Sequence, residues 1–101
     1  MANDLFLGVD IGTSSVRAAF FVESGNLAAM AQQEYPLICT ENGMAELDPE
    51  VVYSKLLDVV RDGLRQVPDG SGRLRAMGFS TQIHSFLAVD ASGRPLTNVL
   101  T

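Results

Sequence analysis

The fold is decided near the start of the chain, by Leu5-Phe6-Leu7-Gly8-Val9-Asp10-Ile11-Gly12-Thr13-Ser14-Ser15-Val16. Residues 5–9 are apolar apart from one glycine, which predicts a central strand that is buried on both faces. A second apolar run covers residues 16–22 and is interrupted only by Arg17. Because the link between the two runs is as short as a turn, the pattern predicts an antiparallel hairpin.

The next segments predict a third strand, a loop and a helix. Residues 27–35 form the third strand, and its polar second half indicates the edge of the sheet. Residues 36–47 lack periodicity and are predicted to be an exposed loop. Asp48 is a suitable helix cap and Pro49 fits the first helical position. The helix face that packs on the sheet is marked by Val52, Leu56, Val59, Val60 and Val67.

The last third of the chain predicts a return to strands. Residues 67–72 contain proline and glycine and end the helix. Residues 74–79 predict a buried strand that is parallel to the first if the helix crosses over the sheet. Residues 86–101 predict a strand, a turn and a strand. The order is βββαβ followed by a β-hairpin, which is typical of an α/β fold with a mixed sheet.

Composition narrows the class of protein. At 101 residues with 47% apolar content, the chain is long enough for one modest core. A net charge of -5 disfavours a broad electrostatic contact with nucleic acid or anionic lipid, so small polar ligands are the expected partners. Cys39 is the only cysteine, which excludes an intrachain disulfide and fits a reducing compartment.

No targeting or membrane signal is evident in the sequence. The apolar runs are far shorter than the roughly 20 residues that span a bilayer, and the N-terminus lacks the basic start of a secretory signal. These features predict a cytoplasmic protein. Since no tail or closing segment follows residues 98–101, the chain is expected to be the front piece of a larger protein.

The turn at residues 12–15 is a candidate phosphate site. Small residues let backbone N–H groups approach phosphate oxygens, and Asp10 at the strand end can hold magnesium directly or through water. Arg17 can reach the same oxygens if its side chain points toward the turn. The alternative is an Asx-type turn at Asp10 with hydroxyls that only satisfy a tight hairpin. The candidate residues are Asp10, Gly12, Thr13, Ser14, Ser15 and Arg17.

A second polar segment follows the strand predicted at residues 74–79. Ligands gather outside the carboxyl ends of parallel strands, so Asp10 and residues 82–84 are predicted to open onto one crevice. His84, the only histidine, can exchange a hydrogen bond with a ligand hydroxyl, and Gln82 offers an amide nearby. The alternative is a histidine that is satisfied by the backbone and shielded by Phe86.

Four blocks of the sequence, in this order, resemble the N-terminal region of FGGY-type carbohydrate kinases. The blocks are Gly8-Val9-Asp10-Ile11-Gly12-Thr13-Ser14-Ser15-Val16-Arg17, Met44-Ala45-Glu46-Leu47-Asp48-Pro49-Glu50, Ser80-Thr81-Gln82-Ile83-His84-Ser85 and Asp90-Ala91-Ser92-Gly93-Arg94-Pro95-Leu96. The resemblance implies the ribonuclease H-like fold of the actin, hexokinase and Hsp70 ATPases. Residues 1–101 are then the N-terminal portion of the first domain, incomplete and without the second domain.

The resemblance also implies an activity, which is ATP-dependent phosphorylation of a sugar or sugar acid such as xylulose or gluconate. The first turn would bind ATP phosphates and Mg²⁺, and the sugar-contacting segment falls on Gln82, Ile83 and His84. A histidine there is similar to the xylulose and gluconate kinase branches, whereas glycerol kinases carry arginine and glutamate. The family's general-base aspartate and adenine-binding domain come later in the chain. Residues 1–101 alone are therefore expected to hold no catalytic residue and to be inactive.

Two other classes of function stay open at this point. A noncatalytic ribonuclease H-like module would serve as a binding or assembly surface, and it would form homo-oligomers through exposed strand edges. A nuclease of related fold needs a cluster of carboxylates for two metal ions. Only Asp10 lies at an obvious strand end, and the acidic balance disfavours nucleic acid.

Overall fold

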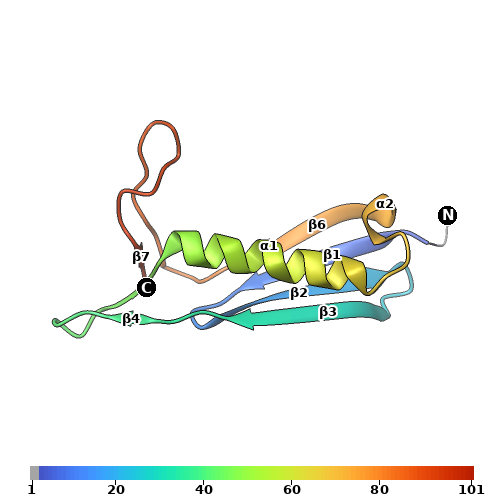
Figure 1. Ribbon diagram of the computed structural model, residues 1–101, viewed down its shortest axis with the longest axis horizontal. Coiled ribbons are helices and arrows are strands. Elements are labelled where there is room, and N and C mark those ends of the chain that lie inside the picture. Colours follow the sequence, from blue (N-terminus) through green and yellow to red (C-terminus); the bar gives the residue numbers. More distant parts are fainter. Residues whose placement is uncertain (1–2) are drawn as a thin grey trace.

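A computed structural model describes residues 3–101 of the chain. The main sheet is built from β1 (Leu5–Ile11), β2 (Ser15–Val22), β3 (Leu27–Glu34) and β6 (Leu74–Ser80). Two helices, α1 (Pro49–Arg65) and α2 (Gly70–Arg73), lie between β3 and β6 in the sequence. The short strands β4 (Ile38–Cys39), β5 (Ala45–Leu47) and β7 (Val99–Leu100) complete the fold (Figure 1).

The main sheet has the strand order β3-β2-β1-β6. β1, β2 and β3 form an antiparallel meander, and β6 pairs with β1 in parallel. The sequence-based predictions of the first hairpin, of an inner position for β1 and of a parallel fourth strand are therefore confirmed. The parallel pairing of β1 and β6 is important for the site, because the residues that follow the two strands then lie at the same edge of the sheet.

Helix α1 begins where the sequence predicts. The Asp48 side chain accepts a hydrogen bond from the Glu50 backbone N–H at 3.0 Å, and Pro49 occupies the first turn. The helix packs on one face of the sheet, over β2 and β3. The helix comes close to β2 at Gly63, which lies against the ring of Phe20. The buried core consists of Leu5, Leu7, Val9, Val16, Ala18, Phe20, Ala29, Tyr35, Leu47, Val59 and Val67.

The prediction that β1 is buried on both faces is wrong. Its residues alternate, so that Leu5, Leu7 and Val9 face α1 while Phe6 is 38% exposed on the opposite face. The prediction of a buried β6 is also wrong, since Met77 and Phe79 are 53% and 57% exposed. In both cases the reason is that α1 lies on one side of the sheet and packs mainly on β2 and β3, which leaves the opposite face of β1 and the side chains of β6 without a helix over them.

Residues 36–47 are not a loop throughout, contrary to the sequence-based prediction. β4 and β5 form a small antiparallel hairpin that turns at Gly43, whose φ is +76°. β7 adds to β5 on its other side, so the C-terminal segment returns to the start of α1. Alternation over so few residues is too weak a signal to predict such short strands.

The predicted strand, turn and strand over residues 86–101 are only partly present. Isolated bridges join Phe86 with Leu100 and Val89 with Pro95, and only residues 99–100 form a strand. The turn itself is well formed, because the Asp90 carboxylate accepts hydrogen bonds from the backbone N–H groups of Ser92 and Arg94. This arm projects from the sheet at the end where α1 begins (Figure 1).

A search of residues 3–101 for a helix with the length and apolar character of a membrane span finds none.

Candidate functional site

The turn between β1 and β2 is a tight two-residue turn. The Gly12 N–H donates to the Ser15 carbonyl at 2.9 Å, which leaves Thr13 and Ser14 exposed at the tip. A Cβ at position 12 would lie 3.2 Å from the Ser15 carbonyl oxygen, closer than ordinary contact. Glycine is thus favoured by the close approach of the two strands. The turn presents backbone and hydroxyl groups to solvent with no large side chain among residues 12–15, as a phosphate site requires.

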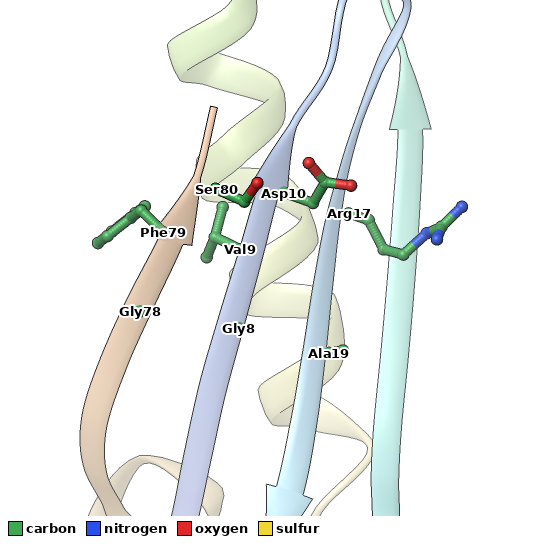
Figure 2. Close-up of a pocket in the computed structure, with 8 residues that line it drawn as sticks. All are labelled: Gly8, Val9, Asp10, Arg17, Ala19, Gly78, Phe79 and Ser80. Atoms are coloured by element: carbon green, nitrogen blue, oxygen red, sulfur yellow. The ribbon is translucent and has the colours of Figure 1, made fainter. Parts of the chain in front are cut away.

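Asp10 lies at the end of β1, on the sheet face that α1 does not cover. Its neighbours across the sheet are Arg17 on β2 and Ser80 on β6. Asp10 is exposed, and within residues 3–101 its carboxylate accepts no hydrogen bond, so an Asx-type turn does not hold it. A shallow hollow of about 470 Å³ lies beside it, floored by Gly8, Ala19 and Gly78 (Figure 2).

Arg17 shares this open face but does not approach the turn. Its guanidinium Nη2 donates to Gln32 Oε1 on β3 at 3.3 Å, and the side chain extends away from Asp10 in Figure 2. The sequence-based prediction required this side chain to point toward the turn. A role for Arg17 in phosphate binding stays a prediction that needs a rotamer change.

The segment after β6 does reach the turn at residues 12–15, which we call the phosphate turn for its predicted role. Gln82 Nε2 donates to the Gly12 carbonyl at 2.7 Å, and Gln82 Oε1 accepts a hydrogen bond from Ser85 Oγ at 2.7 Å. Gln82 therefore lies next to the turn, as the parallel strands predict. A single crevice shared by Asp10 and residues 82–84 stays a prediction, because Asp10 and Gln82 line two different hollows. Ile83 is 82% exposed and His84 is also exposed, so His84 is not an internal histidine shielded by Phe86.

His84 has an unusual backbone conformation. Its φ is 68°, in the left-handed region that non-glycine residues seldom occupy, although histidine is among the residues enriched there. Outliers of this kind cluster at ligand-binding sites and are held by surrounding structure. Here the hydrogen bonds of Gln82 and Ser85 on either side of residues 83–84 provide that support.

Tyr35 supports the candidate site through hydrogen bonds that the sequence-based reasoning missed. It follows β3, is only 5% exposed, and its hydroxyl donates to the Gly12 carbonyl and lies 3.0 Å from the Ser15 carbonyl oxygen. Its own N–H donates to the Ser14 carbonyl at 3.0 Å. The sequence does hold a signal for this contact. Tyr35 comes directly after the polar end of the third strand, and in an antiparallel meander that end lies beside the turn between the first two strands.

Burial raises the pKa of the Tyr35 hydroxyl, and the negative charge of Asp10 raises it further. The folded state therefore holds this proton more tightly than the unfolded chain, in which the pKa is close to 10.0. The resulting stabilisation is complete below about pH 10 and is lost as the pH rises through the raised folded pKa.

We therefore expect the free energy of unfolding to fall above about pH 10 in the wild type, and to fall less steeply in Tyr35→Phe. Urea unfolding at a series of alkaline pH values measures both slopes. Tyr53→Phe is the matched control, because Tyr53 is 59% exposed on α1. Identical slopes for wild type and Tyr35→Phe would contradict the assignment.

The carboxylate of Asp10 fits a magnesium ion that is also bound by substrate phosphates. Within residues 3–101 no group of three or more His, Cys, Asp or Glu side chains converges on a metal position. Mg²⁺ usually keeps several waters and binds one or two carboxylates together with substrate phosphates. The single exposed carboxylate of Asp10 suits that mode and does not suit an all-protein metal cage.

The fold is similar to that of several solved kinases. Gluconate kinase from Lactobacillus acidophilus superposes with a TM-score of 0.89 at 28% identity, over 97% of this chain and 19% of that one. A ligand-bound xylulose kinase from the same organism gives a TM-score of 0.88, also at 28% identity and over the same shares. These neighbours define the class as carbohydrate kinases of the actin and hexokinase ATPase fold, which confirms the predicted ribonuclease H-like α/β class.

Sequence comparison leads to the same family. Gluconokinase from Bacillus subtilis is 33% identical over 94% of this chain, and glycerol kinase from Ralstonia nicotianae is 35% identical over 96%. The chain belongs to the FGGY family of carbohydrate kinases, and residues 5–101 match the model of that family's N-terminal domain. It spans about a fifth of the length of these curated relatives, 18% and 20% respectively.

Proposed function

We propose that the chain is the nucleotide-phosphate and acceptor side of a cytoplasmic, ATP-dependent kinase that phosphorylates a sugar or sugar acid such as gluconate or xylulose. The observation that carries the proposal is the 2.7 Å contact between Gln82 and the Gly12 carbonyl. It joins the two blocks that the resemblance relates to phosphate and to sugar. The reaction would transfer the γ-phosphate of ATP to a hydroxyl group of the acceptor.

The phosphate turn contributes positioning and charge neutralisation. Backbone N–H groups at residues 12–15 and the hydroxyls of Thr13, Ser14 and Ser15 would bind phosphate oxygens. Asp10 would hold Mg²⁺, which neutralises charge on the phosphates when it is bound. Arg17 would add a cation after leaving Gln32.

On the acceptor side, the segment of residues 82–84 would present the exposed Ile83 and His84 to the substrate. His84 is exposed on the same edge of the sheet as the turn and would exchange a hydrogen bond with an acceptor hydroxyl. Gluconokinases among the relatives and xylulose kinases among the structural neighbours support an acceptor of this chemistry.

Residues 1–101 alone are not expected to catalyse transfer. Phosphoryl transfer depends almost wholly on positioning and electrostatic stabilisation around a closed site. Here the hollow beside Asp10 is shallow and open on the side away from the sheet. We use "parent kinase" for a protein that carries this chain together with the rest of the family's length.

The activity is tested with purified parent kinase, labelled ATP and a panel of gluconate, xylulose and glycerol. We expect transfer to gluconate or xylulose in the presence of Mg²⁺, and none from residues 1–101 under the same conditions. A folded parent kinase that phosphorylates no polyol, sugar or sugar acid would contradict the proposal, and turnover by residues 1–101 would contradict the need for a second half.

His84→Ala in the parent kinase should chiefly weaken acceptor binding. Loss of one hydrogen bond to an acceptor hydroxyl is expected to raise the KM for the acceptor about tenfold, with a smaller effect on the KM for ATP. Steady-state kinetics with each substrate varied in turn measures both constants. Asn98→Ala is the control, because Asn98 also follows β6 in the chain but its side chain donates to Glu46. A larger effect on ATP than on the acceptor would mean that the two sides of the site are reversed.

A noncatalytic assembly module is the alternative, and one observation favours it. β6 is an edge strand with Met77 and Phe79 exposed, which is a surface suited to pairing with another chain. A tight homodimer in size-exclusion chromatography, together with no affinity for Mg-nucleotide, would support this module over the kinase.

A further inference from the structure

One backbone oxygen, the Gly12 carbonyl, accepts hydrogen bonds from two side chains of different parts of the fold. The hydroxyl of Tyr35, the residue after β3, approaches from one side, and Gln82 Nε2 approaches from the segment after β6. A carbonyl oxygen has two lone pairs, so its hydrogen-bonding capacity is filled. The position of the turn is therefore set jointly by the core and by the acceptor segment.

Both the nitrogen and the oxygen of the Gln82 amide already form hydrogen bonds. Its nitrogen donates to Gly12 and its oxygen accepts from Ser85 Oγ, each at 2.7 Å, and the side chain is half-buried. A sugar hydroxyl could displace these bonds only by leaving buried polar groups without partners, which is costly. This geometry argues against the sequence-based expectation that Gln82 contacts the sugar.

We propose that Gln82 is a positioning residue that couples the acceptor segment, residues 82–85, to the phosphate turn. The proposal rests on the proposed function and deepens it. When the acceptor orders residues 83–84, the Gln82 amide holds the Gly12 carbonyl and hence the turn in its phosphate-binding form. By linkage, Mg-nucleotide at the turn must strengthen acceptor binding by the same factor.

The two segments that support the Gly12 carbonyl differ in burial. Tyr35 is 5% exposed and belongs to the core, so its hydroxyl acts as a fixed anchor. In the acceptor segment, Gln82 and Ser85 are half-buried, whereas Ile83 and His84 between them are exposed. A ligand that binds Ile83 and His84 acts on the turn through Gln82.

The first test uses the 101-residue chain and needs no kinase activity. The Gly12 N–H closes the turn, so its hydrogen exchange reports turn opening. We expect Gln82→Ala to speed this exchange about three- to tenfold. Gln82→Glu keeps an acceptor for Ser85 but removes the donor to Gly12, and it should behave like Gln82→Ala.

Gln66→Ala is the matched control for this exchange test. The Gln66 amide also donates to a backbone carbonyl, that of Met30 at 3.1 Å, but away from the turn. It should leave exchange at Gly12 unchanged. If Gln82→Ala also leaves Gly12 unchanged, with spectral changes confined to residues 82–85, the positioning role is overturned.

The second test measures coupling in the parent kinase by calorimetry. The Kd for the Mg²⁺ complex of a nonhydrolysable ATP analogue is determined with and without saturating gluconate. In the wild type we expect saturating gluconate to lower the Kd for the nucleotide analogue about tenfold or more. In Gln82→Ala the ratio of the Kd without gluconate to the Kd with gluconate should be close to one. The Kd for gluconate alone should change less than about threefold.

The outcomes separate this proposal from the proposed function. The coupling is overturned if the nucleotide-analogue Kd of the wild type is the same with and without gluconate. It is also overturned if Gln82→Ala loses affinity for gluconate but keeps the wild-type ratio of these Kd values. A parent kinase that binds neither gluconate nor another acceptor overturns the proposed function, whereas exchange at Gly12 still decides whether Gln82 positions the turn.

Discussion

Replacing Asp10 by asparagine in the parent kinase is expected to lower kcat about a hundredfold or more while sparing affinity for the acceptor. The carboxylate is exposed at the end of β1, and no donor within residues 3–101 neutralises it, so it is available to a cation. Loss of an anionic contact to Mg²⁺ removes stabilisation of phosphate charge, and ~3 kcal/mol of such stabilisation corresponds to that factor in rate. Steady-state kinetics with calorimetry for the acceptor measures the two effects separately.

Asp4→Asn is the control, because it removes a negative charge next to the other end of β1. Asp4 precedes β1 at the opposite end and its carboxylate lies 3.5 Å from the guanidinium of Arg75. A surface ion pair contributes little, so turnover should stay within about twofold of the wild type. If Asp10→Asn weakened acceptor binding and left kcat unchanged, Asp10 would belong to the acceptor side of the site.

Replacing Gly63 by alanine is expected to destabilise the fold by about 2 kcal/mol, although alanine is the better helix former. A Cβ at position 63 would lie 2.1 Å from Phe20 Cε1, and the Phe20 ring is fully buried under α1. Helix propensity favours alanine by only about 1 kcal/mol, so the clash dominates. Urea unfolding of the 101-residue chain measures the change.

Two further variants identify the cause of that loss. Ser54→Ala on the exposed face of the same helix should change the free energy of unfolding by no more than about 0.5 kcal/mol. Phe20→Leu makes room for the added methyl group, so the double variant Phe20→Leu with Gly63→Ala should cost less than the sum of the single changes. A stabilised Gly63→Ala variant would mean that α1 does not approach β2 as closely as described.

Much of the site was predictable because its parts depend on local sequence. The small residues at 12–15 and the apolar runs around them predict a hairpin turn, and Asp48 with Pro49 predicts the helix start. Parallel strands bring their carboxyl ends to one edge, which is why the proximity of residues 10–12 and Gln82 could be inferred across the chain. The family resemblance relied on the same blocks.

Other features were not predictable because they depend on groups that are distant in the sequence. The exposure of Phe79 depends on where α1 lies, and α1 covers β2 and β3 rather than β6. The rotamer of Arg17 is set by Gln32 on the neighbouring strand. The strands β4 and β5 are too short for a periodic signal.

The sequence by itself determined the meander, the capped helix and the turn at residues 12–15, because hydrophobic period, turn chemistry and capping act over a few neighbouring residues. The family followed from the resemblance of four motif blocks. Tertiary structure alone decided that Tyr35 and Gln82 meet at one carbonyl oxygen, since each comes from a different strand end and neither has a distinctive local pattern. Hydrogen bonds are short-ranged and directional, so the partners of these two side chains are chosen only when the sheet and helix have brought the segments together.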